Sequence, residues 1–177
     1  MWDLFGTGKA KKEAEEKARR EAELAEWKRT FGNGWETIQL PAGVHEASSI
    51  KYWNGACILI NGGRKVRIEG AGKGKTVIKG RVRVDGRDEE TALELFGLTL
   101  ADSEGSGVII RGKGAVGKVR QCEIRGYKWH GVFVQGGGKG EFEESDIHGN
   151  GYYGVSICDE GSALDARKCN LWDNEWG

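Results

Sequence analysis

This sequence has almost no proline, no long apolar run and no net charge. One of its 177 residues is proline, the longest apolar run covers residues 56–60, and 27 Lys and Arg balance 27 Asp and Glu. A membrane-spanning helix needs about 20 apolar residues, so no transmembrane segment is predicted, and the start does not read as a secretory signal. Zero net charge gives no overall attraction to nucleic acid, and no nucleic-acid partner is predicted.

Cysteine motifs and glycosylation signals are also missing. The four cysteines form no C-x-x-C pair, and no Asn-x-Ser/Thr sequence occurs. The first absence removes the usual zinc and redox motifs, and isolated cysteines of this kind typically fill a core. We therefore predict no metal and no cofactor, and an intracellular or organellar location rather than secretion.

Glycine, in contrast, is abundant, with 30 residues, and its spacing defines a repeat. Gly107, Gly131 and Gly154, the anchor glycines, each precede a short apolar segment, and Gly177 continues the series at a period of 23 to 24 residues. A fixed period of this size is typical of a solenoid, in which each unit buries its apolar face against the next.

Two further columns of residues keep the same register. In each column apolar and polar positions alternate, and each segment has only four or five residues, which is the pattern of a strand. Three short strands per repeat predict an all-β parallel β-helix, with coils stacked about 4.8 Å apart. We expect first coils over residues 36–90 and about three regular coils over 91–177. The two columns are Leu98/Leu100, Cys122/Ile124, Ser145/Ile147, Cys169/Leu171 and Leu95, Val119, Phe142, Ala166.

The column positions also bear on cysteine pairing and on charge. Cys122 and Cys169 share a column but lie two coils apart, roughly 9–10 Å, which is beyond the reach of a disulfide. The outward-facing residues Glu94, Lys118 and Glu141 alternate in sign from coil to coil. Opposite charges on adjacent strands stabilise the pairing, so this alternation supports the same register.

The Gly-Val corners at 107, 131 and 154, with the leading segments 38–44 and 66–80, resemble the right-handed parallel β-helix superfamily, often called pectin-lyase-like. The resemblance covers roughly residues 36–177 and implies a right-handed solenoid with three strands per coil. The superfamily includes polysaccharide lyases, hydrolases, epimerases, viral tail proteins and non-catalytic interaction modules. It therefore implies the fold without implying one function.

An arm at residues 1–31 differs from the β-helix domain predicted over 32–177. Residues 9–30 contain no glycine or proline, and acidic and basic residues four apart favour a charged α-helix. Two roles stay open, namely a cap over the first coil and a docking segment for another protein. The cap would use Leu24, Trp27 and Phe31, and the docking tip would use Trp2, Leu4 and Phe5.

Two glycine-rich strings look like nucleotide-binding motifs. Residues 70–76 read GAGKGKT, but Glu69 stands where a phosphate loop needs its first glycine, and a strand rather than a helix follows. Residues 112–117 match G-x-G-x-x-G but lie between two repeat strands. Neither string predicts nucleotide binding.

A polar column on one outward face is the candidate catalytic site. Glu123 and Asp146 fall on adjacent coils, and His148 lies two residues further along. If the chain is an enzyme, this proximity is expected to raise the pKa of one carboxyl group for acid–base work, and Trp172 would stack on a sugar ring. The alternative interpretation is an ordinary solvated face without catalytic residues.

Aromatic residues gather near the anchor glycines. His130, Tyr153 and Trp176 each stand one residue before a glycine of the series, and Trp129 and Tyr152 adjoin them. Stacking at a corner is one role for these rings. A surface for a protein or glycan partner is the other, and seven tryptophans favour an interface.

The sequence thus favours a non-catalytic β-helix subunit of a larger assembly. Partners would bind through the N-terminal helix, the aromatic strip, or an open coil at Gly177, where the next strand is expected to begin. A carbohydrate-active enzyme and a glycan-binding module remain as alternatives.

Overall fold

The computed structural model describes residues 11, 12, 14, 15, 17–19, 21, 22 and 34–176. The chain divides into two compact units, residues 1–35 and 36–177. The described residues between 11 and 22 are helical, and the ion pairs Lys11–Glu15 and Lys17–Glu21 join side chains one turn apart. The predicted N-terminal helix is therefore confirmed, and no helix in the described part is long and apolar enough to cross a membrane. The arm residues Trp2, Leu4, Phe5, Leu24, Trp27 and Phe31 lie outside the described residues.

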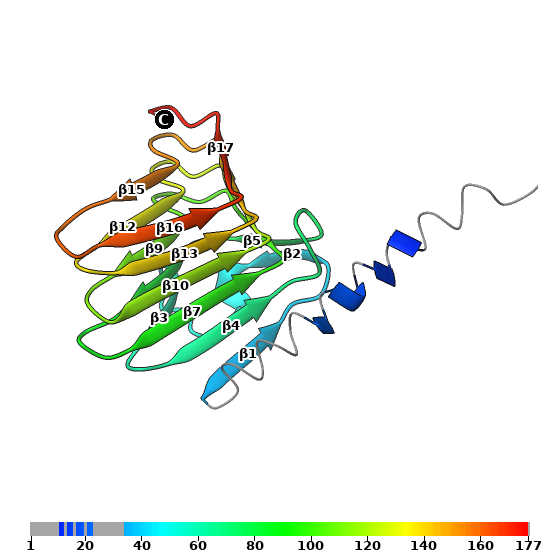
Figure 1. The fold of residues 1–177 in the computed structure, drawn as a ribbon, viewed down its shortest axis with the longest axis horizontal. Helices are drawn as coiled ribbons and strands as arrows, with labels where there is room; N and C mark the ends of the chain where they lie inside the picture. Colours follow the sequence, from blue (N-terminus) through cyan, green and yellow to red (C-terminus); the bar gives the residue numbers. More distant parts are fainter. Residues whose placement is uncertain (1–10, 13, 16, 20, 23–33, 177) are drawn as a thin grey trace, which may run out of the picture. The chain divides into compact units, whose positions relative to one another are not determined.

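The second unit winds into coils of three strands, which stack into three parallel sheets (Figure 1). Sheet A contains β1 (Trp35–Gln39), β4 (Lys65–Glu69), β7 (Thr91–Phe96), β10 (Ala115–Arg120), β13 (Lys139–Glu143) and β16 (Ala163–Arg167). Sheet B contains β2 (Gly43–Glu46), β5 (Thr76–Lys79), β8 (Thr99–Ala101), β11 (Glu123–Arg125), β14 (Asp146–His148) and β17 (Asn170–Trp172). Sheet C contains β3 (Ile58–Asn61), β6 (Val82–Asp85), β9 (Val108–Arg111), β12 (Val132–Gln135) and β15 (Val155–Ile157). A short 3-10 helix, η1 (Ala47–Ser49), follows β2.

The strand register confirms the three predicted columns. Val119 pairs with Leu95 and Phe142, and the sheet B and sheet C columns pair in the same way. The first coils expected over residues 36–90 stack in register with the regular coils over 91–177, as predicted. The early coils do not show the period of 23 to 24 residues because the spacing between their paired strands varies. Strand pairing does not require loops of equal length. Lys65 pairs with Ala92, 27 residues on, whereas Val77 pairs with Thr99 after only 22.

The core fills the inside of the solenoid. Inward residues such as Ile68, Ile78, Leu100 and Ile124 are fully buried and pack as one cluster through the coils. Burying each such side chain contributes about 1.5–3 kcal/mol relative to leaving it in water. The alternation that places these residues inward places their neighbours outward, and this outward set supplies the candidate sites.

The corner between sheets A and B is made by one left-handed residue per coil. Gly97, Gln121, Glu144 and Lys168 occupy this position with φ between 49° and 61°. Only one of the four is glycine, although a left-handed backbone costs a non-glycine residue about 1–2 kcal/mol. Glycine instead marks the turns where the chain enters and leaves sheet C, as at Gly107, Gly112, Gly131 and Gly136.

All four cysteines are free, and their environments differ sharply. Cys122 is enclosed in the core, and burial raises the pKa of its thiol to about 12, whereas Cys158 is exposed. Because a reagent reaches an enclosed thiol only when the core opens, we expect a disulfide-exchange reagent to label the exposed Cys158 much faster than Cys122 in the folded protein. Mass spectrometry of protein quenched at successive times measures both rates. Labelling of Cys122 at the rate of Cys158 would contradict this packing.

Candidate functional site

The candidate catalytic residues do come together on the outer face of sheet B. Adjacent strands β11 and β14 place Glu123 beside Asp146 and Arg125 beside His148. The side chain of His148 reaches back across the register, with Nε2 3.0 Å from Glu123 Oε1. The intervening residue on each strand, Ile124 or Ile147, points into the core. Strand alternation and coil stacking are therefore sufficient to assemble this group.

Three further polar residues complete the group, which we call the sheet B network. Lys73 Nζ lies 2.7 Å from Asp146 Oδ2, and Asn170 Nδ2 donates a 2.9 Å hydrogen bond to Asp146 Oδ1. Thr99 Oγ1 donates to Glu123 Oε2 at 2.9 Å. Lys73 was not predicted, because it belongs to the turn before β5, and β8 and β11 separate that strand from β14. The only sequence signal that distinguished the segment containing Lys73 was its unusual glycine-rich turn at residues 70–75.

Both carboxyl groups of the network are held ionised. Burial opposes the charge on Glu123, but hydrogen bonds from His148 and Thr99 outweigh it and lower its pKa. Burial likewise opposes the charge on Asp146, whose pKa is lowered by Lys73 and Asn170. The expectation that proximity raises one of these pKa values is wrong, because each carboxylate has its own cationic and neutral donors. Near neutral pH neither group carries a proton to donate.

Trp172 covers one end of this network. Its ring stacks on His148 with centroids 4.2 Å apart and planes 9° apart. Arg125 lies 3.5 Å from Glu123 Oε2 and 3.6 Å from Asp102 Oδ1, so a second cation balances the charge. The network can orient these side chains and present one face of the indole. The charges within it are already neutralised by one another.

The second candidate site is the aromatic corner, defined as Trp129, His130, Tyr152, Tyr153 and Trp176. These residues lie in the turns that lead from sheet B to sheet C. His130 stacks on Tyr153 with ring centroids 5.7 Å apart, and Tyr152 meets Tyr153 edge-on at 5.1 Å. Trp176 contacts Tyr152 at 5.6 Å. Four members of the aromatic corner, His130, Tyr152, Tyr153 and Trp176, are thus joined by ring contacts, and Trp129 adjoins them in the chain.

The alignment predicted for one residue of the aromatic corner, Trp176, differs in the structure. Sheet B aligns Arg125 with His148 and His148 with Trp172. Counting four residues onward from each places Trp129, Tyr152 and Trp176 at equivalent positions. Trp176 therefore does not continue the column of His130 and Tyr153, as the glycine spacing predicted, because the last repeat is one residue longer in sheet B than the anchor glycines indicate.

Burial within the aromatic corner is uneven. Trp129 and Trp176 are each 60% exposed, and Tyr152 and Tyr153 are exposed as well. His130 lies beneath them at 9% exposure, between Phe133 and Tyr153. Its Nδ1 is buried without a hydrogen-bond partner. Burial lowers the pKa of His130 below its ordinary value of 6.5.

This burial predicts a pH effect on stability. Because the pKa of His130 is lower in the folded state, the unfolded chain takes up a proton first as the pH falls. Stability that is complete above pH 6.5 is then lost on acidification through and below that value. Urea unfolding at a series of pH values should show a smaller loss for His130→Phe than for the wild type. Equal losses would contradict a neutral, buried His130, since His45 and His148 are present in both proteins.

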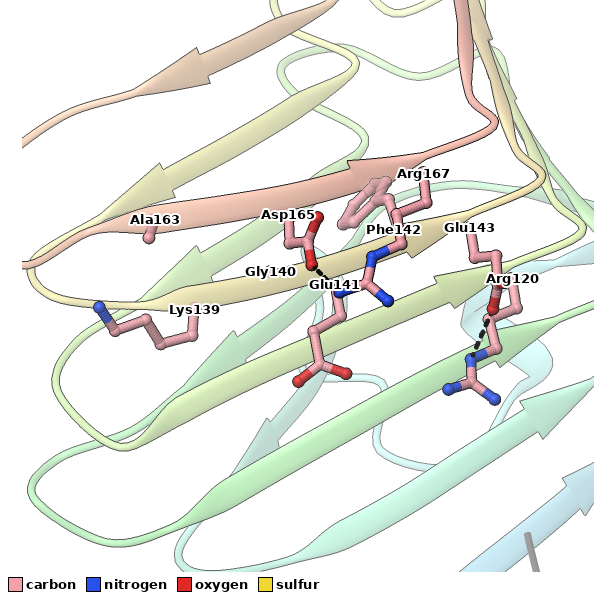
Figure 2. A pocket seen from close by; sticks show the side chains of 9 residues that line it. All are labelled: Arg120, Lys139, Gly140, Glu141, Phe142, Glu143, Ala163, Asp165 and Arg167. Carbon is pink, nitrogen blue, oxygen red and sulfur yellow. Dashed lines mark hydrogen bonds and ion pairs between the residues drawn. The ribbon is translucent and has the colours of Figure 1, made fainter. Parts of the chain in front are cut away.

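A surface hollow lies elsewhere, on the outer face of β10, β13 and β16 (Figure 2). It has a volume of about 490 Å³ and is lined mainly by charged residues. Two ion pairs form within the lining, Arg167 with Asp165 at 2.7 Å and Arg120 near Glu143 at 3.8 Å, and Lys118 beside the hollow pairs with Glu141 at 2.9 Å. None of the predicted site residues lines this hollow.

Comparison with known proteins identifies the class of the chain. The family described as right-handed β-helix region matches residues 44–177, and the chain belongs to this family. A solved structure of the Azotobacter vinelandii mannuronan C-5 epimerase AlgE4 A-module is similar, with 19% identity and a TM-score of 0.37. The match covers 71% of this chain and 52% of that one, so the chain spans about half of its length. No curated protein matches the sequence.

Proposed function

We propose that this chain is a non-catalytic β-helix interaction module within a larger assembly, and that the aromatic corner is its main docking surface. The observation that carries the proposal is the cluster of exposed Tyr152, Tyr153 and Trp176 at one corner of the solenoid, with exposed Trp129 in the equivalent turn of the preceding coil. Tryptophan and tyrosine are the residues most enriched at the energetic centres of protein interfaces. Contiguous exposed rings of this kind mark interaction surfaces rather than ordinary surface.

The sheet B network supports the non-catalytic part of the proposal. A general acid needs a proton near neutral pH, and the pKa values of both Glu123 and Asp146 are lowered by their partners. The ion pair between Lys73 and Asp146 also crosses the intervening strands β8 and β11. This arrangement suits a link that ties successive coils together.

Further docking surfaces are part of the proposal. The coil made by β15, β16 and β17 exposes Ile157 and Leu171, and the N-terminal helix has an exposed charged surface. We propose both as secondary contacts in the assembly. The four free cysteines support an intracellular or organellar location, where thiols stay reduced.

A carbohydrate-active enzyme is the second candidate function. One observation favours it, namely the convergence of Lys73, Glu123, Asp146 and His148 beside an exposed Trp172. In this alternative the ionised carboxylates would serve as bases and Trp172 would hold a sugar ring. A glycan-binding module without catalysis would use the same exposed rings.

Turnover measurements separate these functions. We expect no release of reducing ends, unsaturated products or epimerised residues from uronic-acid polymers above the level of heat-inactivated protein. Glu123→Gln and Asp146→Asn should leave that background unchanged, and thermal unfolding should show that both variants fold. Turnover by the wild type that either variant reduces would overturn the non-catalytic proposal.

A further inference from the structure

The coil made by β15, β16 and β17, which we call the end coil, has one side without a strand partner. Each of its strands stands at one end of its sheet, and among the described residues β16 pairs with β13 alone. Arg167 O accepts a 3.0 Å hydrogen bond from Glu144 N on the β13 side. Successive residues of a strand direct their backbone groups to opposite sides. Leu164 and Ala166 therefore direct their N–H and C=O groups toward the open side.

The inward side chains of the end coil are uncovered as well. Ile157 is 47% exposed and Leu171 46%, whereas the residues that pair with them one coil earlier, Val134 and Ile147, are almost fully buried. An open strand edge is a template for pairing with another strand. A ligand for the end coil should therefore supply backbone donors and acceptors and an apolar surface together, which a second strand with a packed face does.

The outward charges of β16 are complementary to those of a second β16. Asp165 and Arg167 stand on either side of Ala166, and their side chains are 55% and 73% exposed. When two β16 strands pair antiparallel with Ala166 opposite Ala166, Asp165 of each copy faces Arg167 of the other. Directly opposed opposite charges stabilise an antiparallel pair. The same register lets the two Ala166 residues exchange both backbone hydrogen bonds, using the groups that face the open side.

Other strand registers lack this match. An antiparallel pair centred on Asp165 would set two carboxylates against each other, which opposes pairing. A shift by one residue would bring outward side chains against inward ones. A head-to-tail stack would place β1 of another copy on β16. The outward residues of β1 are uncharged, since Gln39 lies beside Glu69 of β4 with Nε2 3.3 Å from Oε2, and Thr37 alternates with Gln39. The charge pattern thus selects a second copy in the antiparallel orientation.

We propose that the end coil binds a second copy of this chain, through antiparallel pairing of the two β16 strands across a two-fold axis at Ala166. Such a contact uses the same surface on both copies and closes at a dimer. Sheet A continues from one copy into the other, so the inward residues Leu164 and Ala166 of both copies lie on one face of the joined sheet. The proposal rests on the proposed function, in which the end coil is a secondary contact, and it names the partner at that contact.

Charge reversal at β16 tests the proposal on the full chain. Sedimentation equilibrium over a range of protein concentrations gives the dimer dissociation constant of the wild type, Asp165→Arg, Arg167→Asp and the double variant that exchanges the two charges. The control variant is Glu104→Arg, which makes the same charge change as Asp165→Arg on a side chain that is 84% exposed outside the end coil. Native mass spectrometry of an equimolar mixture of the two single variants, one of them isotope-labelled, detects heterodimers. Thermal unfolding shows that each variant is folded.

We expect the wild type and Glu104→Arg to dimerise with the same dissociation constant. Each single reversal at β16 should raise that constant about tenfold or more, because it opposes like charges twice in the dimer. The double variant should recover dimerisation, and the mixture of single variants should form heterodimers in preference to homodimers, since each then meets opposite charges.

Three results would overturn the proposal. They are a wild type that stays monomeric at every concentration, assembly beyond the dimer, and a dimer that the β16 reversals do not weaken. The proposed function is tested separately, because it depends on the aromatic corner and not on β16. A monomeric wild type that still recovers a partner through Trp129 and Trp176 would leave the interaction-module function intact.

Discussion

Replacing Arg67 with methionine is expected to lower the free energy of unfolding by about 3–5 kcal/mol, the cost of removing one partner of a buried ion pair. Arg67 and Glu94 face outward on adjacent strands of sheet A, yet both are almost fully buried. Arg67 Nη1 lies 3.1 Å from Glu94 Oε2, and its guanidinium group packs over the Phe96 ring at 4.6 Å. Methionine would keep most of the apolar packing and remove the charge.

The pH dependence of this loss identifies its cause. Burial raises the pKa of Glu94, against the opposing effect of Arg67 and Arg120. Without Arg67 the carboxyl group can avoid its penalty by taking up a proton, so the loss should be smaller at about pH 5 than at about pH 8. A double variant, Arg67→Met with Glu94→Leu, should recover much of the stability because no buried charge remains.

A surface pair on the same strand serves as the control. Lys65 lies 2.8 Å from Glu90, but the Glu90 side chain is 70% exposed. Lys65→Met should therefore change the free energy of unfolding by less than about 1 kcal/mol. Chemical denaturation of the four proteins at two pH values measures all these effects. Equal losses of unfolding free energy for Arg67→Met and Lys65→Met would contradict the burial of the Arg67–Glu94 ion pair.

The second large effect is expected at an anchor glycine. Gly131→Ala should destabilise the fold by about 3 kcal/mol or more, the upper range for overpacking. A Cβ at this position would come 2.8 Å from the carbonyl oxygen of Gly154 one coil on, and 2.6 Å from Ile147. The backbone oxygen cannot move away without displacing the next coil. Gly107 has the same relation to the carbonyl oxygen of Gly131.

The matched control is a corner glycine with open space around it. Gly149 has φ of +62°, and a Cβ there would meet nothing within 4 Å. The equivalent residue of the next coil is Asp173, with φ of 54°, so the site accepts a polar residue in left-handed geometry. Gly149→Asn should therefore cost less than about 1 kcal/mol, as measured by urea unfolding. A Gly131→Ala variant as stable as Gly149→Asn would refute the close approach between coils.

The anchor glycines also show why the fold was largely predictable. Their column repeats because backbone contacts between coils exclude a side chain at Gly107 and Gly131, and this constraint is written directly in the sequence. The early coils were predicted from their resemblance rather than from the period, because β4 to β9 are joined by loops of unequal length. A period search detects equal spacing, whereas the physical requirement is only that strands pair in register.

The candidate site was predictable where paired strands supplied its residues and unpredictable where a loop did. Glu123, Asp146 and His148 follow from strand alternation and register. Lys73 does not, since its position depends on how the turn before β5 folds over the sheet. The burial of Arg67 and Glu94 was equally hidden, because their position on the strands predicts exposed side chains. The pKa values of the carboxylates could not be predicted for the same reason, since their partners were unknown.

The most direct test of the interaction-module function is affinity purification from the cells that make the protein, with recovery quantified by mass spectrometry. Three baits are compared: the wild type, the Trp129→Ala/Trp176→Ala double variant, and Trp172→Ala as the control. We predict that one protein partner is recovered in stoichiometric amount with the wild type and with Trp172→Ala, and at least about tenfold less with the double variant. Recovery of that partner in equal amount with all three baits, or of no stoichiometric partner with the wild type, would contradict the proposed role of the aromatic corner.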